Sequence, residues 1–552
     1  MKNLFIYALS FMSILGFSQA EASHWYFGDG AGIIFDLETG TVTSTNAAQN
    51  TIDTFEGCSS ISDFNGNLLF YTDGRNVWDK NYSIMPNANY SLGTGLMGDP
   101  SSTSSGLIVP KPGNPNEYYV FTVDEPHHQN SFAFPNQGPA NEFGISTEFY
   151  TNPFGSVPED DDGFNNGLAY SLVDLTLNNG NGDVVTSEKN IQLLTYNPNE
   201  QEEESYKCAE KITAVEHSDK QSYWVITHFI DNFYAFRVDS NGVETTPVIT
   251  NINPLISTSG YRRNGIGYIK ASPDGSKIAI CHSQNGNQAG GDSDNGSTWI
   301  YDFDNSSGIL SNPLNLVSNV SQYGVEFSPD SSKLYTSGGG TVLQFDLDAV
   351  NPELSFFELA FGFSFFGALQ LGPDGKIYVA NNEDPFSLDV INFPNELGVD
   401  AGYNAYQMNL SSGSSGLGLP PFIQSFFLAS IQFENSCVDI NTEFSVNSTQ
   451  AYDSILWDFG DGTDTSTENA PSHTYTSAGT YTVSAEITAG TEVSTFSETI
   501  IISSNPIANL ADDIDICDDD NDGVMSFDFV APQTQVLAEQ DPTEFTVSYH
   551  LS

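Results

Sequence analysis

Short apolar runs separated by polar turns recur along most of this chain. The three clearest copies extend over 269–280, 325–336 and 369–379. In each copy an apolar run leads into a Pro-Asp turn, and a second run beginning with lysine follows. Proline presets φ at the second turn position, and glycine at the end of a turn tolerates positive φ. Each copy therefore predicts a β-hairpin.

The spacing of these hairpins predicts the architecture. The turn aspartates Asp274, Asp330 and Asp374 are 56 and 44 residues apart. Weaker copies precede them at 61–71, 111–121 and 216–226. A repeat of about 40 to 50 residues, with about four strands each, is typical of a β-propeller blade.

We therefore predict an all-β fold in which residues 21–432 form a propeller. Six to eight blades would fit this length, and seven are favoured. Trp25-Tyr26-Phe27 near the start and Phe426-Phe427-Leu428 near the end are expected to close the ring in one blade.

A second unit is predicted over 433–504. Its motifs are Trp457-Asp458-Phe459-Gly460-Asp461-Gly462, His473-Thr474-Tyr475 and Gly479-Thr480-Tyr481-Thr482-Val483. The pattern resembles the polycystic-kidney-disease (PKD) repeat, which implies a small immunoglobulin-like β-sandwich. The residues agree with this: Trp457 and Phe459 alternate inward, and Tyr481 and Val483 share one face of a later strand. We interpret Asp458 and Asp461 as turn-forming rather than metal-binding.

An acidic segment begins a third unit, a partial β-repeat over 505–552. Asp518, Asp520 and Asp522 occupy the first, third and fifth positions of a calcium loop, and Gly523 occupies the sixth. Carboxylate oxygens suit Ca²⁺, so these three aspartates are the candidate metal ligands. Phe529 stands where an EF-hand needs glutamate, so the loop is not an EF-hand. The alternative is a solvated acidic turn. Because a strand-like run is cut at Ser552, we expect a fragment of a longer protein.

Charge narrows the class of partner. The chain has 71 acidic and 15 basic residues, a net charge of −56. Such a surface repels nucleic acid and anionic lipid, and it favours divalent cations, cationic partners or neutral ligands such as glycans. The simpler alternative is that the acidity maintains solubility.

The N-terminus is typical of a signal peptide. Lys2 precedes an apolar stretch over 4–17, and Ser18-Gln19-Ala20 places small residues at −3 and −1, so cleavage is expected after Ala20, with Ala22 or Ser23 as the alternatives. No later segment is apolar over the length that a membrane-spanning helix needs, so no membrane insertion is expected.

Export makes disulfides possible, but the cysteine count is odd. Cys58 with Cys208 is one candidate pair, and buried reduced thiols are the alternative. No Cys-x-x-Cys spacing supports a zinc or redox site. The pairing stays open among Cys58, Cys208, Cys281, Cys437 and Cys517.

Several stretches near the N-terminus carry a second resemblance, and they are Trp25-Tyr26-Phe27-Gly28, Phe55-Glu56-Gly57-Cys58, the run 61–78, Pro100-Ser101-Ser102-Thr103 and Pro110-Lys111-Pro112-Gly113. They resemble the opening of large surface proteins from gliding bacteria, and the resemblance covers most of this chain. In that family a propeller-like region precedes PKD repeats, and a C-terminal sorting domain is read by the type IX secretion machinery. The resemblance implies secretion or display on the outer cell surface, and adhesion. This chain lacks the sorting domain, as expected for a fragment.

No catalytic or cofactor-binding residue is assigned. The segment 292–299 resembles the Asp-box of sialidase propellers, with Asp292 in place of serine, but that box is structural in the family. A sialidase needs three arginines to hold the carboxylate of its substrate. The whole chain has only four arginines, so sialidase activity is not expected. The Gly93-x-Gly95-x-x-Gly98 spacing is followed by Asp99-Pro100 rather than a helix, so it does not predict a dinucleotide site.

The sequence thus favours a non-enzymatic exported binding, adhesion or scaffold protein that contacts extracellular glycan or protein ligands. An exported propeller hydrolase or lyase, with the PKD unit as a targeting module, is the first alternative. It would require titratable groups that converge in the central channel. A purely structural adhesin stalk is the second alternative.

Overall fold

The computed structural model describes most of the chain between residues 20 and 538, in separate stretches of sequence. Residues 1–19 of the predicted signal peptide, Phe426-Phe427-Leu428, Asp292, and the predicted calcium ligands Asp518, Asp520 and Asp522 lie outside them. The described residues are 20–36, 39–45, 51–63, 66–124, 166–219, 221–256, 264–283, 296–362, 365–411, 413–424, 430–447, 454–463, 465–489, 492–504, 509–512, 517 and 530–538.

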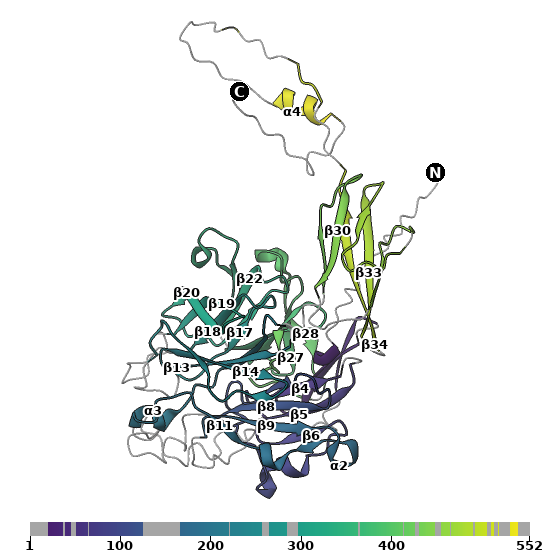
Figure 1. Ribbon diagram of the computed structural model, residues 1–552. Helices are drawn as coiled ribbons and strands as arrows, with labels where there is room; N and C mark the ends of the chain where they lie inside the picture. The colour runs from purple at the N-terminus through teal and green to yellow at the C-terminus, as the bar shows by residue number, and fades with distance from the viewer. Residues whose placement is uncertain are drawn as a thin grey trace.

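Seven antiparallel sheets in this part of the chain surround a common centre, which confirms the all-β fold and the seven blades (Figure 1). The first two sheets have three strands each. They are β1 (His24–Phe27), β2 (Ala31–Asp36) and β3 (Thr41–Ser44), then β4 (Ser59–Ser62), β5 (Leu68–Thr72) and β6 (Val77–Asp79).

The third and fourth sheets have five strands each. The third contains β7 (Leu107–Pro110), β8 (Glu117–Val123), β9 (Leu168–Asp174), β10 (Asp183–Val184) and β11 (Ile191–Leu193). The fourth contains β12 (Ile212–Glu216), β13 (Tyr223–Phe229), β14 (Asn232–Asp239), β15 (Gly242–Val243) and β16 (Val248–Asn251).

The last three sheets have four strands each, in chain order. The fifth contains β17 (Ile269–Ala271), β18 (Lys277–His282), β19 (Ser297–Asp304) and β20 (Ile309–Ser318). The sixth contains β21 (Gly324–Phe327), β22 (Lys333–Gly338), β23 (Thr341–Asp346) and β24 (Phe357–Phe361). The seventh contains β25 (Phe366–Leu371), β26 (Ile377–Asn381), β27 (Ser387–Ile391) and β28 (Tyr403–Asn409).

Helices are few and short. The α-helices are α2 (Leu177–Gly180), α3 (Gln201–Tyr206) and α4 (Val530–Leu537). The 3-10 turns are η1 (Ala20–Ala22), η2 (Pro86–Ala88), η3 (Tyr90–Leu92), η6 (Thr186–Glu188), η7 (Pro352–Leu354) and η8 (Gly398–Ala401). None of the helices among the described residues has the length and apolarity to cross a membrane.

The first strands of successive sheets line the centre of the ring. β1 packs against β4, β7 lies between β4 and β12, and β17 and β21 continue the series to β25. The ring closes between the first and last sheets, where the Trp25 ring lies 5.4 Å from the Tyr378 ring, centroid to centroid. Asp29 and Ser414 also exchange two backbone hydrogen bonds, at 2.8 and 3.1 Å.

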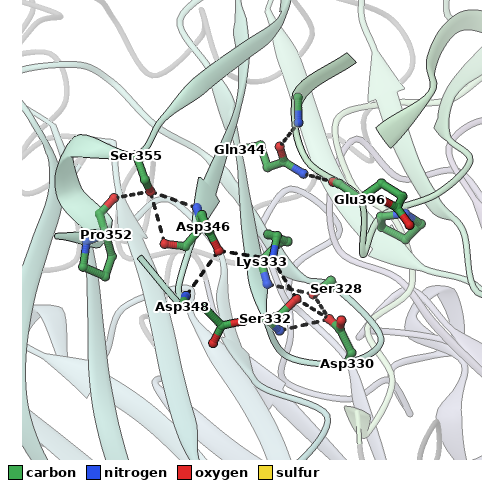
Figure 2. A network of polar contacts seen from close by, with 12 residues as sticks. Ser328, Asp330, Ser332, Lys333, Gln344, Asp346, Asp348, Pro352, Ser355 and Glu396 are labelled. Atoms are coloured by element: carbon green, nitrogen blue, oxygen red, sulfur yellow. Dashed lines mark hydrogen bonds and ion pairs between the residues drawn. The ribbon is translucent and has the colours of Figure 1, made fainter. Parts of the chain in front are cut away.

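The Pro-Asp turns form as predicted. In the sixth sheet the Ser328 hydroxyl donates to Asp330 at 2.6 Å, the Ser332 hydroxyl does so at 2.8 Å, and the Lys333 amide donates back to Ser328 Oγ at 2.8 Å (Figure 2). Ser272, Asp274, Ser276 and Lys277 repeat this pattern in the fifth sheet. In the fifth and sixth sheets the lysine after the turn pairs with an aspartate on the third strand, and the two pairs are Lys277–Asp302 at 2.8 Å and Lys333–Asp346 at 3.1 Å.

A separate β-sandwich follows the propeller. One sheet contains β29 (Ser430–Glu434), β30 (Asn441–Asn447) and β32 (Ser472–Thr474), and the other contains β31 (Ser454–Asp458), β33 (Gly479–Ala489) and β34 (Glu492–Ile502). Trp457 and Phe459 are buried between the sheets as predicted, and Val483 is buried with them. The Tyr475 hydroxyl donates to the Phe459 carbonyl at 2.9 Å.

No disulfide joins any of the five cysteines in the described part of the chain, so the alternative of reduced thiols applies here. Cys58, Cys208 and Cys281 are buried, and Cys517 is exposed. Burial raises the pKa of the Cys281 thiol to about 12, so this thiol is protonated at neutral pH.

Candidate functional site

The strand connections place different parts of each blade at the two ends of the propeller. Each Pro-Asp turn joins the end of a first strand to the start of the second. The start of a first strand and the end of a second strand therefore meet at the opposite end of the blade. Buried polar side chains gather at that opposite end, and we call them the entry cluster: Glu56, Thr103, Glu210, Lys211, His228, His282 and Gln322.

Thr103 links two carboxylates in the entry cluster. Its backbone N–H and its hydroxyl reach the same Glu210 oxygen, Oε2, at 3.0 and 2.8 Å. The hydroxyl also lies 3.3 Å from Glu56 Oε2, and the Gly267 amide donates to it at 3.4 Å. Because one hydroxyl has one proton to donate, the two carboxylates compete for it.

Lys211 lies beside these carboxylates without an ion pair to any described residue. Its ammonium nitrogen Nζ donates to the Asn264 carbonyl at 3.0 Å, and the side chain is fully buried. Burial lowers the pKa of this amine to about 7, although nearby Glu210 acts in the other direction. The amine is therefore poised between its charged and neutral forms near neutral pH.

Two imidazoles complete the cluster. The rings of His228 and His282 lie 5.1 Å apart, centroid to centroid, at the ends of β13 and β18. Burial, with a contribution from Lys211, lowers the pKa of His228 to about 3 and that of His282 well below its usual value. Each ring is thus neutral at physiological pH, with one N–H donor and one acceptor nitrogen.

Several polar atoms of the entry cluster have no hydrogen-bond partner among the described residues. They are Nε2 of His228, both ring nitrogens of His282 and both amide atoms of Gln322. Buried polar groups are nearly always hydrogen-bonded in folded proteins, to protein, to water or to a ligand. We therefore expect water or a ligand to form hydrogen bonds with these atoms.

A second polar group along the inner strands is almost fully paired. Lys270 Nζ lies 3.1 Å from Glu326 Oε2 and also donates to Gln370. The Gln424 amide donates to both Glu326 oxygens at 3.0 Å, and the Leu371 amide donates to Oε2 at 3.1 Å. Such saturation points to a structural role, so the entry cluster is the better candidate site.

The repeat explains why this paired group exists. Lys270, Glu326 and Gln370 each stand four residues before a turn aspartate, so they occupy equivalent positions in three successive hairpins. Equivalent positions on the inner strands face the same axis, which brings cation, anion and amide together.

The aspartates of the sandwich form turns, as interpreted from the sequence. Asp458 accepts from the Gly460 amide at 2.9 Å, and Asp461 accepts from the Thr463 amide at 3.1 Å. Asp461 also lies 2.8 Å from His473 Nε2, while the His473 ring stacks on Phe459. Within the residues that the structure covers, no group of three or more His, Cys, Asp or Glu could hold a metal ion.

In the Gly93-x-Gly95-x-x-Gly98 loop, Gly95 and Gly98 have a packing role. The Leu96 amide donates to the Arg75 carbonyl at 2.8 Å, and the Gly98 amide donates to the Gly74 carbonyl at 3.0 Å. A Cβ atom at Gly95 would lie 3.0 Å from the Arg75 carbonyl oxygen, and one at Gly98 would lie 2.7 Å from that of Gly74. The loop thus needs glycine where two backbones approach closely.

Sequence reasoning did not find the entry cluster. One weak signal was available: Glu210-Lys211, a charged pair directly before the apolar run 212–215, in a chain with few basic residues. His228 and His282 stand at strand ends that only the closed ring brings together.

Comparisons with known proteins identify one part of the chain. Residues 420–503 match the family model of the PKD domain. The PKD1 domain of Vibrio anguillarum Epp is 30% identical over 14% of this chain and 94% of that chain, with a TM-score of 0.12. The PKD1 domain of the Vibrio cholerae metalloprotease PrtV is 34% identical over 13% and 93%, also with a TM-score of 0.12.

Another solved structure is similar over a larger share of the chain. Hydrazine synthase of Kuenenia stuttgartiensis is 13% identical over 70% of this chain and 99% of that chain, with a TM-score of 0.37. No curated protein matches the chain.

Proposed function

We propose that this chain is a non-enzymatic, exported binding protein of the cell surface, whose propeller holds an extracellular ligand at the entry cluster. The PKD domain would act as a spacer or secondary binder. The seven-bladed propeller and the PKD domain are consistent with an extracellular binding module. The resemblance to surface proteins of gliding bacteria supports display through type IX secretion.

The observation that carries the proposal is the set of buried atoms of His228, His282 and Gln322 that have no described partner. Leaving a buried donor or acceptor unsatisfied costs about 1–3 kcal/mol. A ligand or water that pairs with these atoms recovers that free energy. Neutral imidazole and amide groups each offer both a donor and an acceptor, which suits the hydroxyl groups of a glycan.

A glycan array tests this proposal. The mature chain, residues 21–552, is screened with calcium and again with a chelator. We expect selective glycan binding by wild type. Gln322→Leu should abolish this binding, and the control Gln192→Leu, at an exposed position, should preserve it. An absence of binding in both conditions would overturn the glycan proposal, and equal binding by Gln322→Leu would place the ligand elsewhere.

The chelator addresses a further proposal, that Asp518, Asp520 and Asp522 bind calcium. Carboxylates at alternate positions suit this ion. If they bind it, the triple substitution to asparagine removes one calcium per chain in equilibrium dialysis. An unchanged calcium stoichiometry in that variant would leave the acidic segment as a solvated turn.

A hydrolase or lyase is the second candidate, and one observation favours it. Glu210, Lys211, His228 and His282 converge at one end of the ring, as such an enzyme requires. Mass spectrometry of array-positive glycans after incubation separates the two candidates. New products that Lys211→Met abolishes would establish the enzyme, whereas intact glycans that remain bound support the binding protein.

A further inference from the structure

The outer edge of the sixth and seventh blades exposes an unusual number of large apolar side chains. Phe361 on β24 is 70% exposed, Phe357 is 43% exposed, and Val399 on η8 is 92% exposed. Single exposed apolar residues are ordinary, but contiguous groups mark interaction sites. We call this group the phenylalanine patch, and its members are Leu354, Phe356, Phe357, Phe361, Leu397 and Val399.

Two hydrogen bonds join the sixth and seventh blades beneath the patch. The Gln344 amide of β23 donates to the Glu396 carbonyl at 2.6 Å, and the Gly398 amide donates back to Gln344 Oε1 at 2.7 Å (Figure 2). A Cβ atom at Gly398 would lie 3.1 Å from the Phe357 ring, so the ring rests on the η8 backbone. The patch is thus continuous across the two blades.

A second set of hydrogen bonds fixes the segment that leads into β24. The Ser355 hydroxyl lies 2.7 Å from the Pro352 carbonyl and 3.1 Å from the Asp346 carbonyl, and the Asp346 amide donates to it at 2.9 Å (Figure 2). Asp346 in turn pairs with Lys333 at 3.1 Å. The apolar side chains are therefore presented from a backbone that is already ordered, which lowers the entropic cost of binding.

The charge around the patch has one sign. The two segments that build it, 348–361 and 393–402, contain five acidic residues and no Lys, Arg or His. Four of the acids, Asp348, Glu358, Glu396 and Asp400, are exposed. An apolar surface with an acidic border complements a partner that combines apolar and basic side chains.

We propose that the phenylalanine patch docks a polypeptide segment whose apolar side chains alternate with lysine or arginine. A second copy of the chain fits poorly, because it would set acid against acid between two molecules that each carry a net charge of −56. Anionic lipid is repelled for the same reason. This surface lies on the outer edge, so the proposal is independent of the ligand at the entry cluster.

Fluorescence anisotropy of the full chain with labelled peptides tests the proposal. The probe is a peptide of alternating lysine and leucine, and its control alternates glutamate and leucine. We expect binding of the lysine peptide alone, and a decrease of about tenfold in affinity in the Phe357→Ser/Phe361→Ser variant. The matched control is Phe386→Ser, which changes a 58% exposed phenylalanine at the opposite end of β27 and should leave affinity unchanged.

Because the whole chain is acidic, the contact must also be located. A carbodiimide joins a carboxylate to a peptide amine as an amide, with loss of water. Mass spectrometry should then place the cross-links at Glu358, Glu396 or Asp400. Cross-links elsewhere, equal binding by the double variant, or no binding of the lysine peptide would overturn the proposal. A wild-type dimer in sedimentation that the double variant abolishes would overturn it in favour of a second copy.

Discussion

Lys211 and Lys270 are both fully buried, but their surroundings differ. Lys270 pairs with Glu326, whereas Lys211 donates to a carbonyl and has no ion pair among the described residues. Removing one partner of a buried ion pair leaves an uncompensated charge, which costs about 3–5 kcal/mol. We therefore expect Glu326→Gln to lower the free energy of unfolding by about this amount in urea titrations. Lys270→Met/Glu326→Leu removes both charges and should cost less, and a Glu326→Gln variant as stable as wild type would contradict the role of the pair.

The buried imidazoles predict acid sensitivity. In the unfolded chain a histidine takes up a proton near pH 6.5, whereas burial holds the pKa of folded His228 at about 3. Between these values the unfolded state binds more protons, so the free energy of unfolding falls as pH drops below 6.5. Each imidazole contributes up to about 1.4 kcal/mol per pH unit, and above pH 6.5 this contribution is constant.

The measurement for this second prediction is a series of urea titrations from about pH 7 to about pH 5. Other groups also titrate there; burial raises the pKa of Asp53 to about 6, which acts in the opposite sense. The difference between wild type and His282→Gln isolates one imidazole. The variant should lose stability with falling pH less steeply than wild type, and parallel curves would show that His282 is not buried in its neutral form.

At the scale of single elements, two glycines of one turn provide a matched comparison. Gly460 and Gly462 both have positive φ, at 73° and 79°. A methyl group at Gly460 would overlap the Thr482 carbonyl oxygen, whereas nothing lies within 4 Å of a methyl at Gly462. Gly462→Ala should cost about 1–2 kcal/mol, from the left-handed backbone alone. Gly460→Ala should cost clearly more in thermal unfolding of the sandwich, and equal losses would mean that the β33 backbone moves aside.

The elements that local sequence determines were predictable, and those that depend on ring closure were not. Proline, aspartate and serine form the turn at Asp330 from neighbouring residues, so the motif alone indicated the hairpin. Trp457 and Phe459 likewise follow a local alternation. By contrast, the sequence of β24 is mostly apolar, which favours a buried strand. The strand nevertheless lies at the exposed edge of its sheet. The entry cluster draws on residues up to 266 positions apart, from Glu56 to Gln322, so no local pattern could reveal it.

At the scale of the whole molecule, the propeller and the sandwich have separate cores. In the described residues, the sandwich core contains only residues between Ile431 and Ile502. The four propeller core clusters lie between Ala22 and Ile423. Mutational effects on groups that share no partners add independently. The two units are therefore expected to unfold in two separate calorimetric transitions.

Glu326→Gln and Gly460→Ala show which of the two units unfolds in each transition. Glu326→Gln should lower the midpoint of one transition and leave the other within error, because its partners are all propeller residues. Gly460→Ala should do the reverse, because Thr482 belongs to β33 of the sandwich. If each variant shifted both transitions, or if wild type unfolded in a single step with equal calorimetric and van't Hoff enthalpies, the two cores would be coupled. In that case the PKD domain would brace the propeller, and its role as an independent spacer would have to be abandoned.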